Sequence, residues 1–136
     1  MKTQLHTICY VSTAVSTITQ HNISEVFEGI VENNLSLGIT GVLLFQHGNF
    51  MQILEGPSIA MLPLYESIKR DKRHHHIIEI MNQPAEERMF ENYMSGFTII
   101  EPSKEIFQLQ KYIRFLEDNF DEAVKNRAEM VRPFIY

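Results

Sequence analysis

Two polar side chains interrupt apolar strand patterns in this sequence. Residues 50–54 alternate as a strand, and Gln52 lies in the middle of its otherwise apolar face. Residues 5–12 predict another strand, with Tyr10 on one of its faces. Burying an amide or a hydroxyl without a partner costs about 1–3 kcal/mol. Each of these side chains therefore needs a hydrogen-bonding partner.

Two further amides, Asn33 and Asn34, end the first predicted helix. Together with Tyr10 and Gln52 they would suit a planar heterocycle that carries carbonyl and ring-nitrogen acceptors. A simpler arrangement also fits: Tyr10 bonds to backbone, Gln52 pairs with Tyr10, and the asparagines form a helix C-cap. The residues alone leave both arrangements open.

Two other features are weaker candidates for chemistry. The histidines at 74–76 are consecutive, so in an extended segment they point to alternate sides and chelate poorly, and no carboxylate or cysteine stands at ligand spacing. We expect a solvated strand entrance there and no metal. Cys9 is the only cysteine, which excludes an internal disulfide, and we expect a packed small residue.

Composition indicates one globular domain. The chain has 136 residues, 44% of them hydrophobic, and a net charge of -5. The only basic cluster, residues 69–73, is short and lies next to acidic residues, so nucleic-acid binding is not expected. Without a signal peptide or an apolar span of about 20 residues, we expect a cytoplasmic protein with no membrane contact.

The predicted elements run strand, helix, two strands, helix, two strands. We expect strands at 5–12, 39–45, 50–54, 77–81 and 93–100, helices at 23–34 and 60–70, a turn at 46–49 and a loop at 82–91. Asn22 and Glu25 form a possible capping box, Gly38 suits a left-handed helix exit, and Pro63 is tolerated only in a first helical turn.

This order predicts an α+β, ferredoxin-like mixed sheet with both helices on one face. The strand 41–45 is apolar on both sides, so the second face needs a cover as well. An amphipathic helix after Pro102 and a shorter one marked by Phe120, Ala123 and Val124 would supply it. We therefore divide the chain into residues 1–100 and a helical extension, 101–136, packed on the sheet.

With these residues in place, the chain resembles a BLUF domain, a blue-light sensor module that uses a flavin. The resemblance covers about residues 4–100, and the segments that match are 8–12, 33–34, 38–44, 48–57, 71–74, 88–90 and 96–97. It implies that the isoalloxazine ring lies between the two helices and against the sheet, with FAD or FMN as the cofactor.

The resemblance also implies a role for each site residue. Tyr10 would donate an electron and a proton in the photochemistry, and Gln52 would bridge Tyr10 to the flavin. The remaining flavin-binding positions would be Asn34 at the pyrimidine edge, Asn33 and Arg73 near the other carbonyl, Val26 and Ile68 on the two ring faces, and Asp71 and His74 toward the ribityl and phosphate side.

Three positions depart from the family pattern. Tyr93 and Ser95 stand where the family usually has tryptophan and methionine, positions linked to dark recovery and signal coupling. Ser67 replaces a basic residue often found near the phosphate, a role that Lys69 or Arg70 could take over. We expect Ser95→Met to slow dark recovery, and Tyr93→Phe to change the photochemical yield if Tyr93 faces the flavin.

We expect a stand-alone, non-enzymatic blue-light photoreceptor that signals in trans to an unknown downstream protein. The C-terminal helices are the expected contact surface, and a homo-oligomer is possible. Two other classes stay open at this stage. One is a small ferredoxin-like enzyme, of acylphosphatase or flavin reductase type, and the other is an interaction module without a chromophore.

Overall fold

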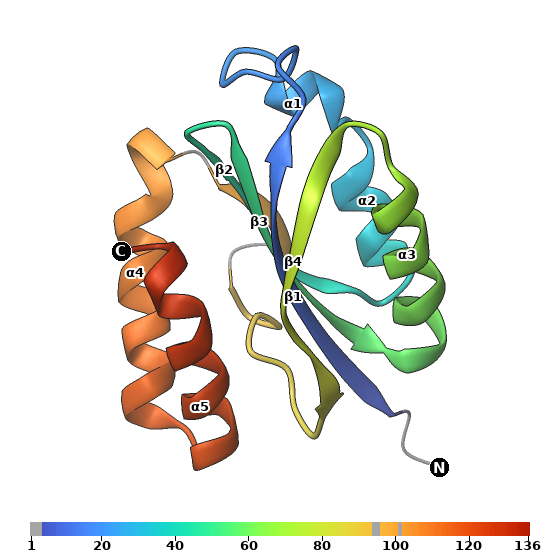
Figure 1. The fold of residues 1–136 in the computed structure, drawn as a ribbon. Coiled ribbons are helices and arrows are strands. Elements are labelled where there is room, and N and C mark those ends of the chain that lie inside the picture. The colour runs from blue at the N-terminus through green and yellow to red at the C-terminus, as the bar shows by residue number, and fades with distance from the viewer. Residues whose placement is uncertain (1–3, 94–95, 101) are drawn as a thin grey trace.

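The computed structural model describes residues 4–93, 96–100 and 102–136, which form three layers. One five-stranded sheet lies in the middle, with α1, α2 and α3 on one face and α4 and α5 on the other (Figure 1). The strands are β1 (Leu5–Ala14), β2 (Thr40–Gln46), β3 (Asn49–Pro57), β4 (His74–Ala85) and β5 (Phe97–Ile100). The predicted ferredoxin-like α+β arrangement is confirmed.

The strand order is β4-β1-β3-β2-β5, and every neighbouring pair is antiparallel except β2 and β5. The predicted hairpin between β2 and β3 is confirmed. His47 and Gly48 both have positive φ, as the central residues of a two-residue type I′ turn require. At Gly41 a Cβ atom would lie 1.9 Å from the Ile53 carbonyl oxygen, so the close approach of β2 to β3 requires glycine there.

The first predicted helix, 23–34, is wrong in one respect because two helices replace it. These are α1 (Ile23–Val26) and α2 (Ile30–Ser36), separated by Phe27–Gly29, where Gly29 has φ 86. The predicted capping box is also wrong, since Asn22 makes no side-chain cap and instead bonds to the backbone of Thr17 and Thr19. The left-handed exit at Gly38, φ 75, is confirmed.

Boundaries of other elements also differ from prediction. Helix α3 (Ser58–Arg70) begins two residues early, so Pro63 lies inside the helix rather than in its first turn. Strand β4 runs through the first half of the predicted loop 82–91, and β5 begins at Phe97 rather than at residue 93. Strand β4 is at the edge of the sheet, which explains why its polar residues did not stand out as a strand.

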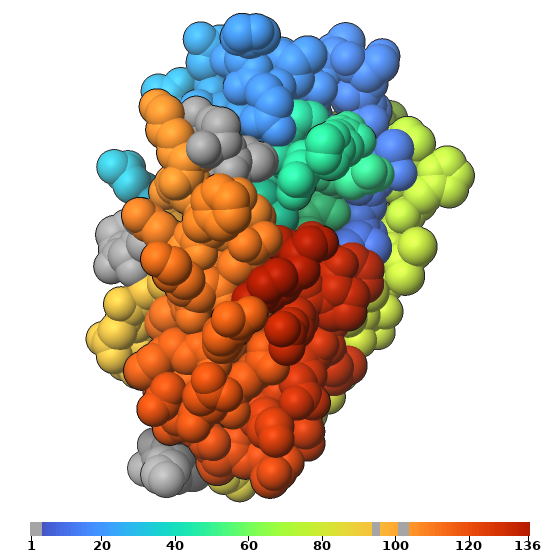
Figure 2. Space-filling model, turned by 90° about the vertical axis from the view of Figure 1, so that its left-hand side faces the viewer, coloured from blue at the N-terminus to red at the C-terminus, as the bar shows by residue number. Residues whose placement is uncertain are grey.

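The second face of the sheet is covered by α4 (Pro102–Asn119) and α5 (Glu122–Val131), which lead into a 3-10 turn, η1 (Arg132–Phe134). Figure 2 shows these helices over much of that side. Leu109, Ile113 and Leu116 are fully buried in the same cluster as Ile53 of the sheet. Phe120 precedes α5 and is 41% exposed, so its predicted place in that helix is wrong.

Among the described residues, none of the helices is long and apolar enough to cross a membrane.

Candidate chromophore site

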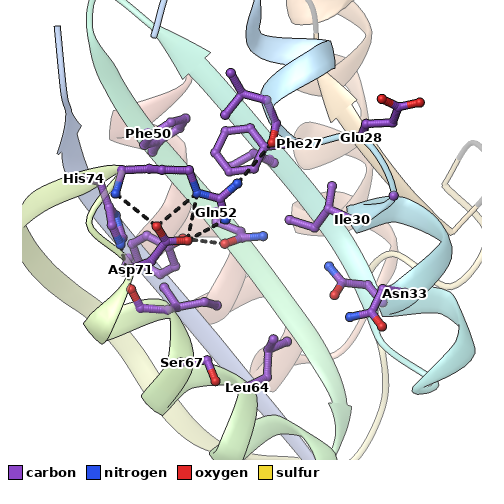
Figure 3. A pocket seen from close by; sticks show the side chains of 17 residues that line it. Phe27, Glu28, Ile30, Asn33, Phe50, Gln52, Leu64, Ser67, Asp71 and His74 are labelled. Carbon is purple, nitrogen blue, oxygen red and sulfur yellow. Dashed lines mark hydrogen bonds and ion pairs between the residues drawn. The ribbon is translucent and has the colours of Figure 1, made fainter. Parts of the chain in front are cut away.

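A cavity of about 420 Å³ lies between the α1–α2 segment and α3, with β3 as its floor (Figure 3). Pockets that bind small molecules span about 300–1,000 Å³. Every residue that the sequence predicts for the photoactive or flavin-binding site lines it: Tyr10, Val26, Asn33, Asn34, Gln52, Ile68, Asp71, Arg73 and His74. The structure therefore brings the predicted residues together around one cavity, while their roles stay predictions.

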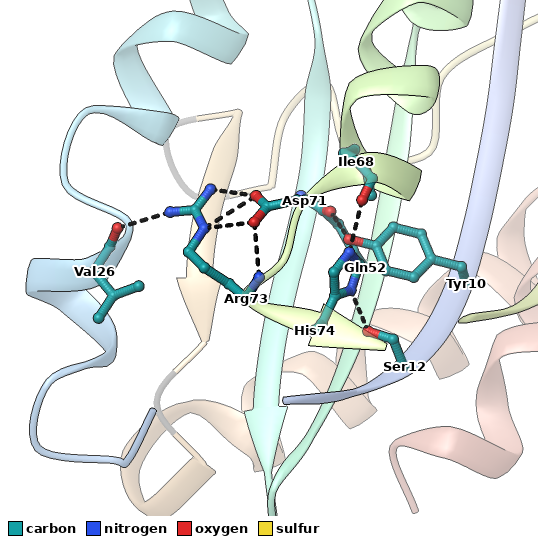
Figure 4. Close-up of polar contacts among 8 residues, drawn as sticks. All are labelled: Tyr10, Ser12, Val26, Gln52, Ile68, Asp71, Arg73 and His74. Carbon is teal, nitrogen blue, oxygen red and sulfur yellow. Dashed lines mark hydrogen bonds and ion pairs between the residues drawn. The ribbon is translucent and has the colours of Figure 1, made fainter. Parts of the chain in front are cut away.

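Tyr10 and Gln52 meet in the wall of this cavity. They are opposite each other in the antiparallel pairing of β1 with β3, and the Tyr10 hydroxyl donates a hydrogen bond to Gln52 Oε1 (Figure 4). Both side chains are buried. A register shift between Cys9 and Tyr10 interrupts the β1–β4 ladder, and such bulges re-aim the side chains next to them. Burial raises the pKa of Tyr10, so its phenol keeps its proton at neutral pH.

Asn34 is the buried polar side chain that points most clearly to a ligand-binding role. The residue is only 1% exposed, and neither its Oδ1 nor its Nδ2 has a hydrogen-bonding partner among the described residues. Its neighbour Asn33 is exposed and lies at the mouth of the cavity on α2 (Figure 3). The helix continues past both residues to Ser36, so the alternative in which the asparagine side chains form a C-cap is wrong.

Arg73 closes one side of the cavity through contacts with two elements. Its guanidinium pairs with Asp71 at 2.5 Å, and its Nη1 donates to the Val26 carbonyl at the end of α1, at 3.0 Å (Figure 4). It also lies 4.6 Å from the centroid of the Phe27 ring. The hydrogen bond from Arg73 lowers the pKa of Asp71, and the same contact raises the pKa of Arg73. Both groups are therefore charged at neutral pH.

His74 ties three elements together beside Tyr10. Its Nδ1 is 2.7 Å from Ser12 Oγ on β1, and its Nε2 is 2.7 Å from the Ile68 carbonyl on α3 (Figure 4). The strand entrance predicted for 74–76 is confirmed, because β4 begins at His74 and the next two histidines are exposed. No group of His, Cys, Asp or Glu residues suited to a metal occurs in the part of the chain that the structure describes.

Sequence reasoning missed the rest of the lining. The additional residues are Phe27, Glu28, Gly29, Ile30, Leu43, Phe50 and Leu64, whereas Ser67, which the family resemblance had placed near the phosphate, also lines the cavity. Several of them come from the break between α1 and α2, which the sequence pattern did not reveal. The hydrophobic residues Phe50 and Leu43 share the face of Gln52 and belong to the same core cluster as Tyr10, a signal that the strand alternation already contained.

Two expectations about charge and signalling change in the structure. Neither Lys69 nor Arg70 lines the cavity, and Lys69 Nζ pairs with Glu66 at 2.8 Å, so neither takes the place left by Ser67.

Tyr93 is buried on the other face of the sheet, where it packs against Tyr112, so it does not face the cavity. Ser95 lies outside the described residues.

The site fits an isoalloxazine ring by two independent observations. Asn34 presents an unpartnered donor and an unpartnered acceptor, as the alternating N–H and carbonyl groups of the pyrimidine edge require. The apolar side chains of Val26 and Ile68 line the cavity from different helices, which suits a flat ring. Polar groups at one edge with apolar walls are typical of small-molecule sites.

Comparisons with known proteins point to one family. The family model described as BLUF, sensors of blue-light using FAD, matches residues 5–96. A curated relative, the photoactivated adenylate cyclase subunit beta of Euglena longa, is 36% identical over 86 residues, which is 63% of this chain and 10% of the relative. The chain spans about a tenth of the length of the curated relatives it matches.

Solved structures agree with this result. The BLUF domain of BlrP1 superposes with a TM-score of 0.77 at 29% identity, covering 99% of this chain and 92% of that one. BlrP1 of Klebsiella pneumoniae with FMN and cyclic diGMP gives a TM-score of 0.73 at 28% identity, covering 96% of this chain and 34% of that one. BLUF domains bind FAD or FMN. Because the family model matches well over half of its length, the chain belongs to the BLUF family of flavin-based blue-light sensors.

Proposed function

We propose that this chain senses blue light through a flavin held non-covalently in the cavity, with Tyr10 and Gln52 as the switching pair. The observation that supports this most directly is the buried hydrogen bond from the Tyr10 hydroxyl to Gln52 Oε1 in the cavity wall, beside the unpartnered amide of Asn34. A bound flavin supplies a chromophore that absorbs blue light and is a strong oxidant once excited.

The chain's own residues carry the response. With flavin bound, Tyr10 would give up an electron to the excited flavin and pass its hydroxyl proton to Gln52, to which it is already hydrogen-bonded. The Gln52 amide then rearranges, so that its N–H donates a new hydrogen bond toward the cavity. When Tyr10 regains its electron and proton, the rearranged amide persists for a time as the signalling state. Asn34, Asn33 and Arg73 hold the ring by its polar edge, and Val26 and Ile68 hold its faces.

The output reaches a partner protein through the α4–α5 surface. Phe107 is 71% exposed, Phe115 is 49% exposed and Phe134 is 39% exposed, so apolar rings are available on this side. Tyr112 of α4 donates to the Met89 carbonyl, which connects the helix to the loop after β4. Tyr93 packs on Tyr112, consistent with a part in this coupling. We therefore propose a sensor that acts through protein contacts rather than an enzyme.

Flavin content tests the first step of this proposal. Protein purified in the dark should be yellow, and denaturation should release about one FAD or FMN per chain, because the cavity has one polar edge for one ring. Refolded, flavin-free protein should take up added FAD or FMN with the same stoichiometry. A colourless protein that takes up neither would overturn the proposed function.

A further inference from the structure

A second phenol lies buried beside Tyr10. Tyr65, on the inner side of α3, is 3% exposed, and its ring centroid is 6.1 Å from that of Tyr10 with 33° between the ring planes. Tyr65 does not line the cavity, whereas the neighbouring Tyr10 does, so Tyr10 provides a route between Tyr65 and the cavity. Two rings at this separation are close enough for rapid electron exchange between them.

The two phenols differ in the base that each hydroxyl faces. Tyr10 donates to the amide oxygen of Gln52, which is a very weak base. Burial, followed by the neighbouring Glu79 carboxylate, raises the pKa of Tyr65. Glu79 lies on β4 directly opposite Tyr10 in the β1–β4 register, and its Oε1 accepts from Asn82 Nδ2 at 3.1 Å. A phenol loses its electron more easily when a carboxylate can take its proton at the same time.

We propose that Tyr65 re-reduces the photo-oxidised Tyr10, with Glu79 as the acceptor of the Tyr65 proton. This inference rests on the proposed function, in which Tyr10 has lost one electron and one proton. Tyr65 gives one electron to Tyr10 and its hydroxyl proton to Glu79, which becomes a carboxylic acid. Tyr10 recovers its own proton across the hydrogen bond from Gln52 and is a phenol again. The electron that first left Tyr10 would stay on the flavin that accepted it, and the radical now resides on Tyr65.

The surroundings of Tyr65 are compatible with a neutral radical. Lys69 Nζ lies 4.8 Å from the Tyr65 ring centroid and disfavours positive charge on the ring. Transfer of the proton to Glu79 leaves the ring uncharged, so this contact does not oppose the step. Lys69 is also ion-paired with Glu66 at 2.8 Å, which reduces its field. The transferred electron and the Tyr65 radical recombine more slowly than the transferred electron and oxidised Tyr10. This slower charge separation competes with the reversible switch.

Trapped radicals distinguish this step from a structural role of Tyr65. The yellow protein is expressed in medium that contains either ordinary or ring-deuterated tyrosine. It is then illuminated with blue light at low temperature and examined by electron paramagnetic resonance. We expect a long-lived tyrosyl radical in the wild type. Tyr65→Phe removes the phenol itself, and Glu79→Gln removes a positioned proton acceptor, which speeds such transfers by about 100-fold or more. Each variant should therefore lower the yield of this radical by about tenfold. Tyr136→Phe, which removes an exposed phenol far from the cavity, is the matched control and should leave the yield unchanged.

The outcomes separate this inference from the proposed function. Both Tyr65→Phe and Glu79→Gln should keep the reversible absorption shift, because Tyr10 and Gln52 are intact. If the wild type shows the shift but no long-lived radical, or if the radical is as abundant in Tyr65→Phe, the role of Tyr65 is wrong and the sensor stands. If the wild type shows no shift at all, the proposed function itself fails.

Discussion

The Asn34 amide reports on flavin binding without any photochemistry. Its two polar atoms are buried without partners among the described residues, which costs about 1–3 kcal/mol in the flavin-free protein. Leucine has nearly the same shape and no polar atoms. Replacing Asn34 by leucine should therefore stabilise the flavin-free protein and weaken the binding of flavin.

We expect Asn34→Leu to raise the free energy of unfolding of the flavin-free protein by about 1 kcal/mol or more. The same variant should weaken flavin binding by about tenfold or more, because two hydrogen bonds to the ring are lost. Urea titration and flavin titration measure the two effects. Asn126→Leu, on an exposed face of α5, is the matched control and should change neither. Unchanged flavin affinity in Asn34→Leu would remove Asn34 from the site.

The variant Tyr93→Phe should change the stability of the protein and leave its photochemistry unchanged. Its hydroxyl is buried without a partner among the described residues, and burial raises its pKa. Tyr93→Phe should therefore stabilise the protein by about 1 kcal/mol in thermal or urea unfolding. Because Tyr93 lies on the face away from the cavity, the photochemical yield should stay unchanged. A lower yield in this variant would show that Tyr93 reaches the chromophore after all.

At the residue scale, strand alternation was enough to single out Tyr10 and Gln52. An amide or a phenol on an apolar strand face must have a partner, and the structure pairs these two with each other. The unpartnered state of Asn34 had no such signal, because it depends on which helix face turns toward the sheet. The pairing of Arg73 with the Val26 carbonyl likewise depends on where α1 ends.

At the scale of elements, β3 joins the cavity to the far face of the sheet. Gln52 points toward the cavity, and Glu55 points to the other face. The Glu55 carboxylate accepts the backbone N–H groups of Met89 and Phe90 at 2.7 and 2.5 Å, and the Thr40 hydroxyl at 2.9 Å. It thereby fixes the loop that the α4 residue Tyr112 also contacts.

Glu55 predicts a pH dependence of stability. Burial raises its pKa, so the folded state holds this proton more tightly than the unfolded chain. Protonated Glu55 therefore contributes to the free energy of unfolding at pH values below the pKa of about 4.3 that it has in the unfolded chain. This contribution is lost as the pH rises through the pKa of Glu55 in the folded state. We expect this loss in the wild type and not in Glu55→Gln, measured by urea unfolding at a series of pH values. Glu129→Gln, which changes an exposed carboxyl on α5, is the control, and equal slopes in Glu55→Gln and wild type would contradict the assignment.

Element boundaries show where sequence patterns stop being informative. Apolar residues recur with helical spacing through Phe27, Ile30 and Val31, so the pattern hides the break at Gly29, which only its positive φ reveals. Strand β4 is exposed along much of one edge, so its polar residues resemble a loop. Hairpin chemistry at His47-Gly48 is local, and for that reason it was predicted correctly.

At the scale of the whole molecule, the C-terminal helices share one core with the sheet. Val124, Ala128 and Val131 of α5 are fully buried in the cluster that contains Ile53 and Val42. The family model matches residues 5–96, so these helices lie beyond the segment that it matches. The sequence predicted the need for a cover from the apolar strand 41–45, whose two faces both had to be buried.

We expect the chain to unfold in one cooperative transition because this core crosses the predicted boundary at residue 100. Flavin fluorescence should report the unfolding of the sensor segment, and far-ultraviolet circular dichroism should report the unfolding of the helices. The two signals should have the same urea midpoint. A chain shortened to residues 1–100 exposes the apolar face of the sheet and should aggregate or lose its flavin. Two separate transitions would instead show that residues 101–136 fold independently.

The most direct test of the Tyr10–Gln52 switch is the absorption spectrum of the yellow protein before and after blue light. We expect a small red shift of the flavin band that reverses fully in the dark, without net reduction of the flavin. Tyr10→Phe and Gln52→Leu should each bind flavin and show no shift, because one lacks the donor and the other the amide that rearranges. A full reversible shift in Tyr10→Phe would contradict the proposed mechanism.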